Sequence, residues 1–125
     1  MVAPVILVVD AEPAIRVLAK RFLERSGYKA LEAGSGEEAL RILRRQPCDV
    51  ALLLTDIVMT GISGTQLAAE ARKVQPGLPV VFMSGYCSTF AESIEGYRCL
   101  QKPFKSQELV SLVAEALTVK VRSAH

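Results

Sequence analysis

The sequence places a polar residue at the end of each of four predicted strands: Asp10, Asp56, Ser84 and Lys102. Two carboxylates brought close together repel each other and attract a hard divalent cation such as Mg²⁺. An ammonium and a hydroxyl would converge on the same place. Each of these residues alone is common in loops, so the prediction of a functional site rests on all four together.

Short apolar runs rich in branched residues indicate the strands that position these groups. Residues 5–9, 50–54 and 80–83 are typical of strands buried on both faces, and weaker strands are predicted at 29–33 and 97–101. The intervening segments show helical spacing of apolar residues: Ile15, Leu18, Ala19, Phe22 and Leu23; Ala39, Ile42 and Leu43; Leu67, Ala71 and Val74; Leu109, Leu112, Val113, Ala116 and Leu117.

Helix starts are marked by local signals. Pro13 suits a first helical turn, and three Ser/Thr-x-x-Glu/Gln capping boxes follow: Ser35 with Glu38, Ser63 with Gln66, and Thr89 with Glu92. Five βα units in a row predict an α/β fold with a five-stranded parallel sheet covered on both faces. Ligands of such sheets bind at the carboxyl ends of the strands.

Length and charge leave few classes of protein open. The chain has 125 residues, which is the size of one domain, and its formal net charge of +2 gives no reason to expect direct binding of nucleic acid or membrane. The first apolar run ends after five residues at Asp10, so neither a signal peptide nor a membrane span is predicted there. We expect a cytoplasmic protein.

Three cysteines are present: Cys48, Cys87 and Cys99. Their number is odd and they show no C-x-x-C spacing, which favours reduced packing residues over disulfides or a zinc site.

Four stretches in order resemble the receiver domain of bacterial two-component signalling: VILVVDAEPAIR, LLLTDIVMTGISG, VVFMSGY and LQKPF. The sequences LTDIVM, SGY and LQKPF are most similar to those of receivers of hybrid histidine kinases. The resemblance covers residues 1–119 and leaves 120–125 as a tail or the start of a linker. It implies a doubly wound, flavodoxin-like sheet in the order 2-1-3-4-5.

The same resemblance implies roles for individual residues. Asp56 would accept a phosphoryl group from the phosphohistidine of a histidine kinase or phosphotransfer domain, and Ser84 and Lys102 would contact that group. Mg²⁺ would be held by Asp10, Asp56 and the backbone carbonyl of Val58. The Lys102–Pro103 peptide would be cis, and a weak dimer could form through the fourth helix, fifth strand and fifth helix.

Two positions depart from the receiver pattern. Ala11 stands where a second acidic residue normally contacts the metal, so we expect Mg²⁺ binding to be weakened at least ~10–100-fold. Cys99 stands where an aromatic switch residue is usual. Tyr97, two residues earlier on the same strand face, could substitute for it, although a packed surface tyrosine is the favoured interpretation.

Two other functions stay open at this point. The Ala11 position could leave a phosphorylation-independent docking or regulatory module. The fold could also belong to a small phosphatase that turns over many substrate molecules without a kinase.

Overall fold

The computed structural model describes residues 3–45, 49–88 and 98–123. Five parallel strands form one sheet in the order β2-β1-β3-β4-β5, as predicted. The strands are β1 (Val5–Val9), β2 (Lys29–Ala33), β3 (Val50–Asp56), β4 (Val80–Ser84) and β5 (Arg98–Gln101). The helices are α1 (Pro13–Arg25), α2 (Gly36–Arg45), α3 (Gly64–Val74) and α5 (Ser106–Ser123).

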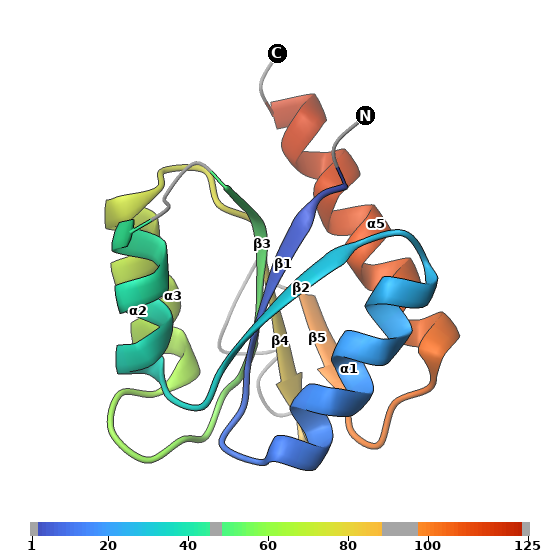
Figure 1. Ribbon diagram of the computed structural model, residues 1–125, viewed down its shortest axis with the longest axis horizontal. Coiled ribbons are helices and arrows are strands. Elements are labelled where there is room, and N and C mark those ends of the chain that lie inside the picture. The colour runs from blue at the N-terminus through green and yellow to red at the C-terminus, as the bar shows by residue number, and fades with distance from the viewer. Residues whose placement is uncertain (1–2, 46–48, 89–97, 124–125) are drawn as a thin grey trace.

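Helices cover both faces of the sheet (Figure 1). On one face, α2 and α3 enclose a cluster of buried apolar residues that includes Leu43, Leu53 and Leu67. On the other face, α1 and α5 enclose a second cluster that includes Leu23, Leu54 and Val113. The strands supply residues to both clusters in alternation, which explains why their sequences are continuously apolar.

Two strands are longer than predicted, and the extra residues belong to the site. Strand β3 continues to Asp56, which pairs with Met83 of β4, and β4 continues to Ser84, which pairs with Gln101 of β5. The sheet therefore fixes Asp56 and Ser84 directly, with no intervening loop.

The predicted helix starts are confirmed within the described residues. Pro13 opens α1, and the Ser35 hydroxyl accepts a hydrogen bond from the Glu38 amide. At α3 both bonds of the capping box are present between Ser63 and Gln66. The predicted box at 89–92 and Tyr97 lie outside the described residues.

The prediction of reduced cysteines is wrong for two of the three. Cys87 and Cys99 form a disulfide, with Cα atoms 5.7 Å apart, whereas Cys48 lies outside the described residues. The partners meet because β4 and β5 are neighbours and the chain turns directly after Ser84. Spacing along the sequence carries no signal for a pairing that depends on the register of two parallel strands.

No helix within the described ranges has the length and apolar character needed to cross a membrane.

Candidate functional site

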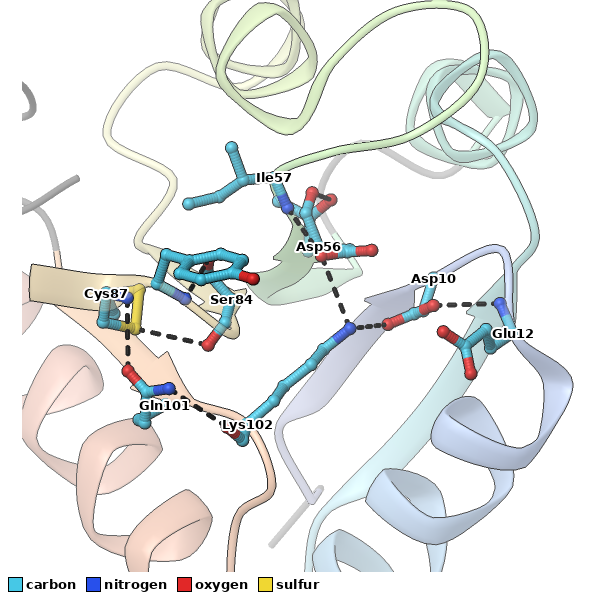
Figure 2. Close-up of polar contacts among 11 residues, drawn as sticks. Asp10, Glu12, Asp56, Ile57, Ser84, Cys87, Gln101 and Lys102 are labelled. Atoms are coloured by element: carbon cyan, nitrogen blue, oxygen red, sulfur yellow. Dashed lines mark hydrogen bonds and ion pairs between the residues drawn. A yellow bond between two sulfur atoms is a disulfide. The ribbon is translucent and has the colours of Figure 1, made fainter. Parts of the chain in front are cut away.

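The four predicted residues meet at the carboxyl edge of the sheet (Figure 2). Asp10 follows β1, Asp56 ends β3, Ser84 ends β4 and Lys102 follows β5. Strands β1 and β3 are neighbours at the centre of the sheet, which brings the two carboxylates together as predicted.

The Lys102 ammonium lies between both carboxylates. Its Nζ is 2.8 Å from Asp10 Oδ2 and 3.4 Å from Asp56 Oδ1. The Lys102–Pro103 peptide is cis, as predicted. One cation is therefore shared by two anions, a position that favours positive charge.

Asp10 is fully buried and held on several sides. Its Oδ1 accepts a hydrogen bond from the Glu12 amide at 2.9 Å, while its backbone oxygen accepts one from Arg16 at 2.6 Å. Its own amide donates to the carbonyl of Ala33 in β2. A carboxylate bound in this way is well placed to hold a cation and poorly placed to meet an external substrate.

Asp56 is more accessible, with 17% of its side chain exposed against 1% for Asp10. Its Oδ1 accepts a hydrogen bond from the Ile57 amide at 3.0 Å. Burial raises the pKa of Asp56 above its ordinary value of 3.8, and the negative charge of Asp10 adds to this, although Lys102 opposes it.

Lys102 keeps its charge in this setting. Burial lowers its pKa, but the hydrogen bond to Asp10 and the attraction of Asp56 outweigh burial, so the pKa is raised above 10.5. The Lys102 amide also donates to the carbonyl of Ser84 at 2.8 Å, which ties β5 to the end of β4. The Ser84 hydroxyl accepts a hydrogen bond from the Tyr86 amide at 2.9 Å.

The residues proposed from the sequence as metal ligands are hard oxygen donors, which suit Mg²⁺. Val58, two residues beyond Asp56, is 75% exposed, and Ala11 is exposed beside Asp10. Within the described ranges, no group of three or more His, Cys, Asp or Glu side chains converges. Asp10 and Asp56 supply carboxylate oxygens, the donor type that Mg²⁺ prefers, and the position between them is taken by the Lys102 ammonium.

Three supporting residues were not anticipated. Gly64, the first residue of α3, donates its amide to the Ile57 carbonyl at 2.8 Å, and a Cβ at this position would overlap the carbonyl oxygen of Asp56. Gln101 bonds to the turn after Ser84, and Arg16 holds the Asp10 backbone. All three stand inside the stretches that resemble receivers, VILVVDAEPAIR, LLLTDIVMTGISG and LQKPF, but their residue types alone give no sign of these contacts.

The family model described as "Response regulator receiver domain" matches residues 6–114. The chain is 35% identical over 116 residues to the sensor kinase CckA of Brucella abortus (strain 2308), covering 90% of this chain and 12% of that protein. It is also 35% identical over 116 residues to the transcriptional regulatory protein GlrR of Escherichia coli (strain K12), covering 90% of this chain and 26% of that protein. The chain thus spans only a minor part of these relatives.

A solved receiver domain from the hybrid histidine kinase CckA is similar with a TM-score of 0.80 and 38% identity, covering 90% of this chain and 98% of that one. None of these relatives supports the alternative of a phosphorylation-independent docking module. Receiver domains accept a phosphoryl group on an aspartate, generally with Mg²⁺, and interact with histidine kinases or phosphotransfer proteins. With its matching sheet order, its carboxyl-edge cluster and these relatives, the chain belongs to the response regulator receiver domain family.

Proposed function

We propose that Asp56 is the phosphoacceptor of this receiver and that Lys102 and Ser84 bind the transferred group. The observation that carries the proposal is the Lys102 ammonium, 3.4 Å from the accessible carboxylate of Asp56 and anchored on the other side by buried Asp10. An anchored cation is ready to neutralise a phosphoryl oxygen without first being desolvated.

Exposure separates the two carboxylates by role. Asp56 has the more exposed side chain. In Asp10, one carboxylate oxygen accepts a hydrogen bond from the Glu12 amide and the other accepts one from Lys102. The nucleophile must reach a phosphorus atom on a partner, so Asp56 is the acceptor and Asp10 is a supporting anion.

The transfer is a displacement at phosphorus. An Asp56 carboxylate oxygen forms a P–O bond while the P–N bond to the partner's histidine breaks, and the electron pair of that bond leaves with the imidazole nitrogen. The new acyl phosphate places negative charge beside Lys102, and the Ser84 hydroxyl at the end of β4 can donate a hydrogen bond to a phosphoryl oxygen.

Asp10, Asp56 and the backbone carbonyl of Val58 are the residues that would hold Mg²⁺, which when bound neutralises phosphoryl charge and orients the group. Ala11 offers no carboxylate, so we expect binding that is weaker at least ~10–100-fold than in receivers with two adjacent acids. Because Ala11 is exposed, an acid there meets no packing obstacle.

Replacing Ala11 tests this point. Ala11→Asp is expected to tighten Mg²⁺ binding by at least about tenfold, since it returns a carboxylate to the loop after β1. A Mg²⁺ titration followed by amide chemical shifts measures the affinity of both proteins. Equal affinities would show that position 11 does not limit metal binding.

Switching would follow through the turn after β4. A phosphoryl group that binds Ser84 favours one arrangement of that turn over others, and a partner reads the difference. The donor of the phosphoryl group is a histidine kinase or a histidine phosphotransfer domain, and a hybrid histidine kinase is the setting that we favour.

Phosphoacceptance is measured with acetyl phosphate and Mg²⁺ followed by intact mass. We expect an adduct of about 80 Da that disappears in Asp56→Asn and persists in the matched control Asp49→Asn, an exposed aspartate. No adduct at high Mg²⁺ would contradict phosphoacceptance and favour a docking module. Continuous phosphate release beyond the stoichiometric adduct would indicate a phosphatase instead.

A further inference from the structure

The Cys87–Cys99 disulfide joins the turn after the phosphoryl-binding strand to the neighbouring strand. Cys87 lies three residues beyond Ser84, and Cys99 lies within β5, three residues before Lys102. The bridge therefore connects the chain segments that carry two residues of the site (Figure 2).

Hydrogen bonds from one side chain reinforce the same connection. The carboxamide of Gln101 accepts from the Cys87 amide at 3.2 Å and donates to the Gly85 carbonyl at 2.7 Å. With the disulfide in place, the turn from Ser84 to Cys87 is fixed to β5 both covalently and by these bonds.

Both cysteines have some access to the surface, although Cys99 also packs against the apolar cluster under α2 and α3. Cys87 and Cys99 are each partly exposed, and Gly85 and Tyr86 beside them are exposed. Structural disulfides resist reduction, and exposed disulfides have higher reduction potentials and include the labile and regulatory ones.

We propose that Cys87–Cys99 is a redox modification site that exchanges with a dithiol reductant, and that its oxidation state sets the rate of phosphoryl transfer to Asp56. The proposal of a redox modification site depends on the disulfide and not on the function of Asp56. The proposal that its oxidation state regulates phosphoryl transfer rests on the function proposed above, because it concerns the same site.

Reduction proceeds by thiol–disulfide exchange. A thiolate of the reductant attacks one sulfur of the pair, the Cys87–Cys99 bond breaks, and a mixed disulfide forms with one cysteine while the other leaves as a thiolate. The second thiolate of the reductant then attacks the reductant's own sulfur in the mixed disulfide and releases the remaining cysteine as a thiolate. Two electrons and two protons pass to the cysteines, and the reductant leaves as its own disulfide.

Reduction replaces a covalent tether with a weak contact. Cys87 Sγ lies 3.7 Å from the Ser84 carbonyl oxygen, and only the reduced thiol carries a hydrogen to donate there. With the disulfide broken, the turn after Ser84 is held to β5 by hydrogen bonds such as those of Gln101 and no longer covalently. The turn can then rearrange more readily when Ser84 engages a phosphoryl group, which is the step that the proposed regulation acts on. The reduced protein is expected to accept the group at least about fivefold faster, the lower end of ordinary coupling between two sites.

The first measurement counts thiols in the 125-residue chain carrying Cys48→Ser, a background that leaves only this pair of cysteines in it. After treatment with oxidised glutathione, alkylation and intact mass should show no free thiol, and after treatment with dithiothreitol they should show two. Two free thiols after oxidation, in protein whose circular dichroism spectrum is native, would overturn the modification site.

The second measurement compares initial rates of adduct formation from acetyl phosphate in the two redox states of the same chain. Cys48→Ser/Cys87→Ser/Cys99→Ser is the control, and it should show one rate, equal to that of the reduced pair, in both buffers. A disulfide that forms while both rates are equal would overturn the regulation and leave phosphoacceptance standing. No adduct in either state would remove the regulation together with the proposed function, while the thiol count still decides the modification site.

Discussion

Asp56 and Asp10 share one ammonium, so at this edge of the sheet two negative charges meet one positive charge. Burial, with the added repulsion of Asp10, raises the pKa of Asp56 in the folded protein above 3.8. A carboxyl group with a raised folded pKa binds its proton more tightly when folded, so its contribution to stability falls as pH rises through that folded pKa. Ionised Asp56 therefore destabilises the protein at neutral pH.

Asp56→Asn is accordingly expected to be more stable than the natural sequence at neutral pH, and this advantage should disappear below the ordinary value of 3.8. Urea unfolding at neutral pH and at a pH below 3.8 measures the difference in unfolding free energy between the variant and the unchanged chain, with Asp49→Asn as the matched control. A variant that is less stable at neutral pH would show that the Asp56–Lys102 attraction outweighs burial.

Lys102 is the partner that makes buried Asp10 tolerable. Lys102→Met removes the ammonium and leaves a carboxylate uncompensated, which is expected to cost about 3 kcal/mol of unfolding free energy. Asp10→Asn in the same chain should recover most of that loss, because the unpaired charge is gone. Chemical denaturation of the single and double variants tests the coupling, and Lys105→Met, at an exposed lysine, is the control. Additive losses in the double variant would contradict it.

At the scale of elements, the start of α3 is packed directly against the end of β3. A Cβ at Gly64 would overlap the carbonyl oxygen of Asp56 and lie 2.9 Å from Ile57 Cα, and backbone atoms cannot move aside as a flexible side chain does. Gly64→Ala is expected to cost about 1–3 kcal/mol and to slow phosphorylation by displacing Asp56. Thermal unfolding measures the loss of stability, and Gly85→Ala, where a Cβ meets nothing within 4 Å, is its control. Unchanged stability in Gly64→Ala would show that α3 shifts freely.

The elements that the sequence predicts well are those whose signals are local. Runs of branched apolar residues identify strands such as β1, and the Ser63–Gln66 box identifies the start of α3, because these patterns act within a few residues. Asp10 and Asp56 could be placed together because carboxyl ends of adjacent parallel strands share an edge. The strand order itself came from resemblance to receivers.

The remaining features depend on contacts between distant segments. The Cys87–Cys99 bridge needs the β4–β5 register, and the role of Gly64 needs the closeness of α3 to Asp56. Neither is encoded in composition or spacing. The extension of β3 to Asp56 likewise reflects pairing with β4, because an aspartate has low strand propensity on its own.

For the whole molecule, the sheet separates two apolar cores, and we expect them to unfold together. Leu43 of α2 is buried in one cluster and Leu23 of α1 in the other, and both are fully enclosed. Leu43→Ala and Leu23→Ala are each expected to cost about 2–5 kcal/mol. Because the two sites share no cluster, the losses in the double variant should add to within about 0.5 kcal/mol.

Urea unfolding followed by both circular dichroism and tyrosine fluorescence tests this prediction. Coincident curves for each single variant would show that either core, once weakened, lowers the stability of the entire sheet. Two separate transitions would instead show that one helical layer can melt while the other holds. The carboxyl-edge site takes Asp10 and Asp56 from strands shared by both layers, so such partial melting would also predict that the site loses its geometry before the chain unfolds.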